Sequence, residues 1–314
     1  MSIQNIKMDK LKVFIWKLLY GTYYRFCYLC TYKVRKLLCI FDSETTVRYI
    51  LNHRCSVSRF GDGEFQMITH YINKGTIDSF LVDSFQNYDA KLAMRLMEVL
   101  TTYSPNHLVC IPYAFKKSSV FKGYGRIFFE REWLKRKKSI LNFLLDRNFG
   151  DASFTRFYYG RQDIKDYNAY IKLLKCIWDK KEVLLVEGEQ SRLGVGNDLF
   201  DNALNIHRVL CPSVNAFERY EAILSTVKTF PKDWLIMIAL GHTATVLAYD
   251  LSKYGYQALD IGHIDIEYEW MKMKATRKVA IQGKYVNEVP DDGGRTPVQC
   301  KDSVYLSQIV KKIE

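Results

Sequence analysis

The fold is decided by the stretch Glu182–Asp198, which reads EVLLVEGEQSRLGVGND. It begins with a nearly uninterrupted apolar run (EVLLV) of the length of a buried strand and continues into a turn rich in glycine and polar residues. Three later stretches repeat this plan of an apolar strand followed by a polar turn: Ile206–Cys211, Trp234–Leu240 and Gln257–Ile261. Because these strands alternate with helical stretches, we expect an α/β fold, with a Rossmann-like, mostly parallel sheet and helices on both faces.

The rest of the chain follows the same alternation. The sequence predicts strands over Ser56–Phe60 and His107–Tyr113, and helices over Ser43–Arg54, Phe65–Ile72, Lys91–Tyr103, Arg126–Leu145, from about Asn197, over Asn215–Phe230, over Ala244–Tyr254 and near Val304–Ile313. We expect three parts: a basic, aromatic, amphipathic helical segment (1–40), a main domain (41–275) and a C-terminal extension (276–314).

Composition and charge narrow the function classes. The 314 residues are 48% hydrophobic and 25% charged, which is ordinary for a globular protein and excludes a disordered chain or a collagen-like repeat. The formal net charge is +12, but residues 1–40 hold eight Lys or Arg and one Asp, so most of the excess is N-terminal. The remaining surface is only mildly basic, and we therefore expect no nucleic-acid partner.

The N-terminal segment interleaves aromatic and aliphatic side chains with lysine and arginine. Lys17 and Arg25 interrupt its apolar run and no small-residue cleavage site follows, so the sequence indicates neither a secretory signal nor a membrane span. A cationic, aromatic helix suits a membrane surface with anionic lipids. It equally suits packing on the main domain or on a partner subunit, and both interpretations stay open here. Cys27 and Cys30 lack a second pair of zinc ligands, so we expect reduced thiols.

Polar and glycine-rich residues follow four of the predicted strands, where ligands bind in parallel α/β sheets. These turns are RFGDGE at 59–64, EGEQSRLGVGND at 187–198, GHT at 241–243 and GHIDIEYE at 262–269. Because the carboxyl ends of parallel strands meet at one edge of the sheet, four such turns predict a single site there.

The first turn places two carboxylates two residues apart. Asp62 and Glu64 could hold Mg²⁺ or Mn²⁺, which bind one or two carboxylates together with substrate phosphates. Arg59 could pair with a phosphate oxygen, next to Gly61 at the tight turn. The alternative is an ordinary helix start, where acidic residues complement the helix dipole.

The second turn has the character of an anion-binding loop. Backbone N–H groups near Gly194 and Gly196 could approach a phosphate, with further contacts from Ser191, Arg192 and Asn197. The loop departs from the dinucleotide fingerprint at its last glycine position, lacks the P-loop lysine, and the chain has no GxSxG motif. NAD enzymes, P-loop NTPases and serine hydrolases are therefore excluded, while an ordinary strand–helix turn remains the alternative.

The last two turns offer acid–base groups. His263 lies beside Asp265, Glu267 and Glu269, any of which could act as a general base or a metal contact. His242 stands at a predicted helix N-terminus, which favours a neutral imidazole that can bond a substrate oxygen. An exposed acidic helix start and a structural histidine are the respective alternatives.

Five blocks of the sequence, in this order, resemble the GT-D type glycosyltransferases, a family first described as a domain of unknown function in streptococcal protein-glycosylation and capsule clusters. The blocks are RFGDGE, EGEQSRLGVGNDLFDNA, RVLCPSVNAFERYEAIL, ALGHTATVLAYDL and GYQALDIGHIDIEYEW, and the resemblance runs from about residue 43 to 271. It implies a Rossmann-like sheet, a nucleotide-sugar donor (typically a UDP-sugar), and Mn²⁺ or Mg²⁺ held by a DxE motif at Asp62 and Glu64. The SRLGVGND turn would belong to the donor pocket. His242 departs from the proline expected at its position, so its catalytic role rests on local chemistry alone.

The sequence as a whole therefore predicts a metal-dependent glycosyltransferase of cell-surface polysaccharide or glycoprotein biosynthesis. Its acceptor would be a lipid-linked or protein-linked glycan, with residues 1–40 docking the enzyme on the inner face of the cell membrane from the cytoplasm. Two alternatives remain open: a metal-dependent nucleotide phosphohydrolase, and a non-catalytic, membrane-docked assembly subunit.

Overall fold

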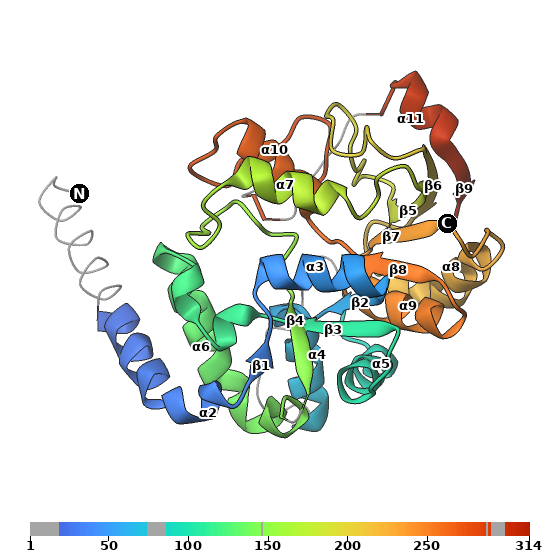
Figure 1. Cartoon of the computed structure of the whole chain (residues 1–314). Helices are drawn as coiled ribbons and strands as arrows, with labels where there is room; N and C mark the ends of the chain where they lie inside the picture. Colours follow the sequence, from blue (N-terminus) through green and yellow to red (C-terminus); the bar gives the residue numbers. More distant parts are fainter. Residues whose placement is uncertain (1–18, 74–85, 146, 287, 290–298) are drawn as a thin grey trace, which may run out of the picture.

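The computed structural model describes residues 19–73, 86–145, 147–286, 288–289 and 299–314. These residues contain a nine-stranded parallel sheet in the order β1-β4-β3-β2-β8-β7-β5-β6-β9 (Figure 1). The strands are β1 (Cys39–Ile40), β2 (Ser56–Arg59), β3 (His107–Ile111), β4 (Asn148–Asp151), β5 (Glu182–Gly188), β6 (Asn205–Cys211), β7 (Leu235–Ala239), β8 (Gln257–Asp260) and β9 (Ile309–Lys312). The expected α/β fold is confirmed.

Helices cover both faces of the sheet and bury a separate hydrophobic core on each. They are α2 (Tyr32–Lys36), α3 (Ser43–His53), α4 (Asp62–Ile72), α5 (Ala90–Thr101), α6 (Gly123–Ile140), α7 (Tyr167–Lys175), α8 (Tyr220–Val227), α9 (His242–Lys253), α10 (Ile264–Lys272) and α11 (Ser303–Gln308), with a further helical stretch over residues 19–30. In Figure 1, α3, α7 and α10 lie on one side of the sheet, and α4, α5, α8 and α9 on the other. The buried residues of strands β5 and β7 alternate between the two cores, as Val183 and Leu184 illustrate. This explains why these strands are almost uniformly apolar.

The helix predicted from about Asn197 is wrong. Residues 189–204 form a series of turns, because Arg192, Gly194 and Gly196 adopt positive φ angles (49°, 73° and 78°) that reverse the chain repeatedly. The side chain of Asn197 caps the backbone N–H of Leu199 at 3.0 Å, which favours a turn over a helix.

The final helix predicted near Val304–Ile313 is wrong in its second half. Helix α11 ends at Gln308, and β9 follows it directly as the edge strand beside β6. The β-branched residues Ile309 and Val310 suit this strand. The chain beyond residue 276 thus contributes to the main sheet.

The N-terminal helical segment packs along α6 through one of its faces, while residues 1–18 lie outside the described part of the chain. Arg25 Nε donates to Glu130 Oε1 at 2.6 Å, Trp133 Nε1 donates to Thr31 Oγ1 at 3.0 Å, and the Tyr28 hydroxyl is buried against the loop before α6. Within the described residues, no helix combines the length and the apolar character needed to cross a bilayer. All eight cysteines are free thiols in the structure.

Candidate active site

A cavity of about 1360 Å³ lies beyond the carboxyl ends of the central strands. Its walls come from the segments that follow β2, β3, β4, β5, β7 and β8. Among the predicted site residues, those that line it are Arg59, Gly61, Asp62, Glu64, Ser191, His242, His263 and Glu267. The predicted site residues that do not line it are Arg192, Gly194, Gly196, Asn197, Asp265 and Glu269. The site therefore lies at the edge of the sheet where the sequence places it.

Asp62 and Glu64 occupy the first turn of α4, so this helix begins three residues earlier than predicted. Glu64 Oε2 accepts a hydrogen bond from the backbone N–H of Gly61 at 2.7 Å, which fixes its side chain across the helix start. Asp62 is accessible to solvent inside the cavity. The pKa of its carboxyl is raised because surrounding protein atoms desolvate it and because Glu64 and Glu132 add negative charge. Two carboxylates with repelling charges thus face the cavity.

The donor set at this point fits a hard divalent cation that also binds substrate oxygens. No group of three or more His, Cys, Asp and Glu side chains converges as a metal site within the described ranges. A cation here would have at most the two carboxylates from the protein, which is how Mg²⁺ is commonly held beside substrate phosphates. A bound cation would also relieve the repulsion between Asp62 and Glu64.

His242, the first residue of α9, lies against the start of α4. Its Nε2 is 3.9 Å from Glu64 Oε1, and the side chain is 6% exposed. A Cβ built on Gly63 would lie 2.2 Å from this Nε2, so only glycine at position 63 leaves room for the imidazole. His242 and Glu64 are therefore held side by side on the cavity wall.

The guanidinium of Arg59 forms its hydrogen bonds with other groups of the protein. Its Nε and Nη2 donate to Asp260 Oδ1 at 3.2 and 3.1 Å, and its Nη1 donates to Thr155 Oγ1 at 2.7 Å. Gly262, with a φ of +46°, makes room for this guanidinium, since a Cβ there would lie 1.7 Å from Nη2. Asp260 is buried, and its desolvation raises the pKa of its carboxyl, while the charge on Arg59 opposes that rise. Arg59 thus joins β2, β8 and the segment after β4, which supports the cavity floor.

A second arginine, which the sequence analysis missed, points into the cavity. Arg156 Nη2 donates to Glu288 Oε1 at 2.5 Å and lies 3.0 Å from His263 Nδ1. Burial lowers the pKa of Arg156, but the carboxylates of Glu288, Glu267 and Asp62 more than offset this, so its pKa is raised overall. The guanidinium is a permanent cation that lines the same cavity as Asp62.

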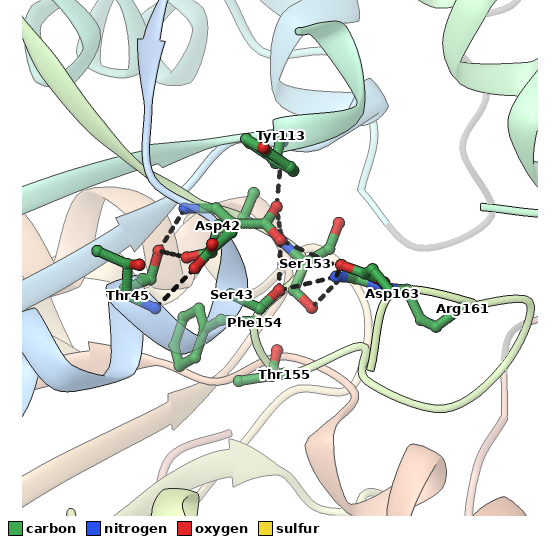
Figure 2. A network of polar contacts seen from close by, with 12 residues as sticks. Asp42, Ser43, Thr45, Tyr113, Ser153, Phe154, Thr155, Arg161 and Asp163 are labelled. Atoms are coloured by element: carbon green, nitrogen blue, oxygen red, sulfur yellow. Dashed lines mark hydrogen bonds and ion pairs between the residues drawn. The ribbon is translucent and has the colours of Figure 1, made fainter. Parts of the chain in front are cut away.

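The sequence does not indicate a role for Arg156, because the strand that positions it, β4, has the sequence NFGD and no apolar run that would predict a strand. The segment after β4 is anchored by a buried polar network (Figure 2). Ser43 Oγ and the backbone N–H groups of Tyr113 and Ser153 donate to the carboxylate of Asp151, at 2.5, 3.1 and 2.9 Å. Arg161 completes the network, because its Nη2 donates to Ser43 Oγ at 2.9 Å and its Nε to Asp163 Oδ1 at 2.8 Å.

The turn over residues 191–198, which we call the glycine loop, is held by two of the protein's own carboxylates. The backbone N–H of Leu193 donates to Glu187 Oε2 at 2.7 Å, and that of Gly194 donates to Asp265 Oδ1 at 2.9 Å. These two backbone N–H groups, which the sequence predicts as possible phosphate ligands, therefore already have hydrogen-bond acceptors within the protein. Ser191 and Leu193 are the residues of the 191–198 turn that line the cavity.

The three carboxylates of α10 are in different environments. Lys284 Nζ donates to Asp265 Oδ2 at 2.7 Å and to Glu269 Oε1 at 3.0 Å, and Asn197 Nδ2 bridges the same two carboxylates. Glu267 alone lines the cavity, and its Oε2 accepts from the backbone N–H groups of Tyr158 and Tyr159 at 2.9 and 2.8 Å. Burial raises the pKa of the Glu267 carboxyl, and Arg156 and these N–H groups oppose the rise.

Comparison with known proteins agrees with this geometry. A family model described as the glycosyltransferase GT-D fold matches residues 57–289. The chain is 36% identical over 272 residues to the glycosyltransferase GlyD of Streptococcus pneumoniae. The aligned region covers 86% of this chain and 32% of that protein. The chain is 35% identical over 276 residues to a probable glycosyl transferase, Gly, of Streptococcus gordonii, covering 87% of this chain and 39% of that protein. The chain thus spans about a third of the length of these curated relatives.

Solved structures give the same result. One, described as the highly conserved domain of unknown function 1792 with a distinct glycosyltransferase fold, superposes with a TM-score of 0.83 at 37% identity, over 91% of this chain and all of that chain (100%). Another, described as a new glycosyltransferase of this domain type from Streptococcus sanguinis, has a TM-score of 0.77 at 34% identity, over 88% of this chain and 100% of that chain. Sequence, fold and relatives together lead to one conclusion: the chain belongs to the GT-D family of glycosyltransferases.

Proposed function

We propose that this domain transfers a sugar from a nucleotide-sugar donor, a UDP-sugar by the family resemblance, to a glycan acceptor in a reaction that depends on Mn²⁺ or Mg²⁺. The observation that carries the proposal is the placing of Asp62, Glu64 and Arg156 on the walls of one cavity at the carboxyl edge of the sheet. Carboxylates that hold a cation, together with a fixed arginine, can neutralise the charge that develops on a leaving diphosphate.

The metal belongs at Asp62 and Glu64 in this proposal, where it would neutralise the diphosphate as the glycosidic bond breaks. Arg156 contributes a second, permanent positive charge, which Glu288 and His263 hold in place. Ser191 and Leu193 line the cavity after β5, where this proposal places the nucleotide of the donor. The imidazole of His242 lies beside Glu64, where it could form a hydrogen bond with an oxygen of the nucleotide-sugar.

We propose Glu267 as the base that accepts the proton of the acceptor hydroxyl in an inverting reaction. Asp265 and Glu269 are both paired with Lys284 and do not line the cavity, whereas Glu267 does. A carboxyl whose pKa is raised by burial is a stronger base than an exposed one. Its two backbone hydrogen bonds hold it in one orientation.

Turnover of UDP-, GDP- and dTDP-sugars with Mn²⁺ tests this function. The expected result is slow release of nucleoside diphosphate without an acceptor, faster release with a glycan acceptor, and neither after chelation with EDTA. A phosphohydrolase would instead release phosphate or sugar phosphate at a rate that no acceptor changes. A non-catalytic subunit would release nothing from any donor, and either result would overturn the proposal.

We also propose that residues 1–40 dock the domain on a membrane surface that contains anionic lipid, at the inner face of the cell membrane. The helical stretch over residues 19–30 and α2 bury one face against the domain and leave a second apolar face exposed. This exposed stripe consists of Leu19, Tyr23, Phe26, Leu29, Tyr32 and Leu37. Exposed lysines at positions 33 and 36 flank it, which suits the interface of an anionic bilayer. A lipid-linked acceptor would be met at the same surface.

A further inference from the structure

The cavity is larger than one small ligand needs, and its far side is aromatic. Its volume of about 1360 Å³ exceeds the ~300–1,000 Å³ typical of a single small-molecule site. Beyond the polar groups described above, eight phenylalanine and tyrosine side chains border it, and seven of them follow β3 or β4: Phe121, Tyr124, Phe128, Phe129, Tyr158, Tyr159 and Tyr167. We call these seven residues the aromatic rim. Tyr124 is 71% exposed, so the rim opens to solvent.

The rim is built in advance of any ligand. Its two segments are joined by backbone hydrogen bonds from Lys122 N to Gly160 O at 2.9 Å and from Gln162 N to Val120 O at 3.0 Å. The guanidinium of Arg161 lies 5.0 Å from the centre of the Phe121 ring, and the same side chain is locked into the buried network of Figure 2. The Arg161 guanidinium thus holds the buried Phe121 ring, and the backbone bridge ties the two rim segments together, as a preorganised binding surface requires.

The order of the strands separates this rim from the nucleotide side. Along the sheet the order is β4, β3, β2, β8, β7, β5. The rim follows β3 and β4, Asp62 follows β2, and Ser191 follows β5 at the opposite end of the cavity. Between β5 and β7 the chain connections diverge, to β6 on one side and to β8 on the other, and such a switch point is where nucleotides bind in these sheets. A donor whose base lies near β5 and whose diphosphate lies at Asp62 leaves the rim to the second substrate.

We propose that the aromatic rim is the acceptor subsite and stacks a pyranose ring of the acceptor glycan, an inference that rests on the proposed function. The C–H faces of a pyranose pack on aromatic rings while its hydroxyl edge stays hydrated. The exposure of Tyr124 at the mouth lets the remainder of a long glycan, or its lipid or protein carrier, stay outside the cavity. A free nucleotide has no such remainder to keep in solvent.

Saturation-transfer NMR with methyl pyranosides tests the subsite, using sorbitol as an open-chain probe and Mn²⁺–UDP calorimetry in parallel. The variants are Tyr124→Leu, which keeps apolar bulk but removes the aromatic face, and Tyr124→Phe, which restores that face. Tyr103→Leu is the matched control, because Tyr103 is 78% exposed and lies outside the cavity. Since Tyr124 is also exposed, all three variants are expected to fold.

The expected result is that at least one pyranoside, but not sorbitol, receives saturation from the native domain. Tyr124→Leu should weaken pyranoside binding about two- to tenfold, and Tyr124→Phe and Tyr103→Leu should not. Mn²⁺–UDP affinity should be the same in all of them. Equal pyranoside binding in Tyr124→Leu, or none in the native domain while Mn²⁺–UDP binds, would overturn the subsite. If the native domain does not bind Mn²⁺–UDP at all, the result would instead contradict the proposed function itself.

Discussion

Gly63 shows how one absent side chain shapes the candidate site. It stands between Asp62 and Glu64, and the imidazole of His242 fills the space that a Cβ would occupy. A DxE pattern is therefore not enough to build this wall of the cavity, because the middle residue must also be small. The sequence offered Asp62, Glu64 and His242 as separate candidates, and only the packing of α4 against the start of α9 joins them.

Gly63→Ala should destabilise the domain by about 1–3 kcal/mol, because its Cβ would overlap Nε2 of His242. In a His242→Ala background the same substitution should cost nothing or stabilise by up to ~1 kcal/mol, since alanine is the better helix former. Urea unfolding of the four proteins measures both free energies. An equal cost in the two backgrounds would show that the imidazole is not what position 63 must accommodate.

His107 gives the fold a pH dependence remote from the cavity. Burial, with smaller contributions from the charges of Arg147 and Lys253, lowers the pKa of this histidine to about 3. Its Nε2 forms a hydrogen bond with Ser58 Oγ at 2.8 Å, and its ring contacts Tyr249. In the unfolded chain the pKa is about 6.5. As the pH falls below that value the unfolded state gains a proton that the folded state does not, so the free energy of unfolding falls.

His107→Gln should remove this contribution while keeping a polar partner for Ser58. The native domain should lose about 1–2 kcal/mol more than the variant between pH 7 and pH 5, because each pKa unit is worth about 1.4 kcal/mol. Urea midpoints for both proteins at the two pH values measure the difference. Parallel changes in the two proteins would contradict a buried, neutral His107.

At the scale of elements, the sequence predicted those strands and helices whose pattern is local. Strand β7 and residues 183–186 of β5 are continuously apolar, and α5 is amphipathic, so their positions followed from composition and spacing. Strand β4 was missed because only Phe149 in it is apolar, and β9 because it pairs at the sheet edge after a short helix. Arg156 and Glu288 were missed with them, since neither belongs to a motif and long-range packing alone brings them together.

We expect the exposed stripe of the N-terminal helical stretch to be needed for membrane binding. Tyr23 and Phe26 are 62% and 66% exposed, so replacing both by serine should leave the fold intact. The double variant should bind vesicles that contain phosphatidylglycerol at least about tenfold more weakly, because two large apolar contacts with the interface are lost. Vesicle co-sedimentation measures this.

The control for the stripe is Tyr103→Ser, which removes an equally exposed aromatic residue elsewhere and should bind vesicles as the native domain does. Vesicles of phosphatidylcholine alone should retain little protein, since the flanking lysines need anionic lipid. Unchanged sedimentation of the double variant would contradict a role of the stripe in membrane binding, and equal binding to both kinds of vesicle would contradict the need for anionic lipid.

At the scale of the whole molecule, a single parallel sheet sets the order of the chemistry. The glycine loop after β5, the carboxylates after β2 and the aromatic rim after β3 and β4 are far apart in the sequence, but they lie in a row because the sheet orders them. The sequence predicted that the turns share one edge. It could not predict which of them face the cavity, because that depends on the pairs formed by Glu187, Asp265 and Lys284.

Calorimetric titration of UDP with Mn²⁺ into Asp62→Asn tests whether this cavity binds a nucleoside diphosphate through a cation at Asp62 and Glu64. Glu44→Gln is the matched control, because Glu44 also lies in the first turn of a helix but on the outer surface, paired with Arg48. Mn²⁺-dependent UDP binding is expected in the native domain and in Glu44→Gln, and it should weaken by at least about a hundredfold in Asp62→Asn. Equal Mn²⁺-dependent binding in Asp62→Asn and the native domain would contradict a cation site at Asp62 and Glu64.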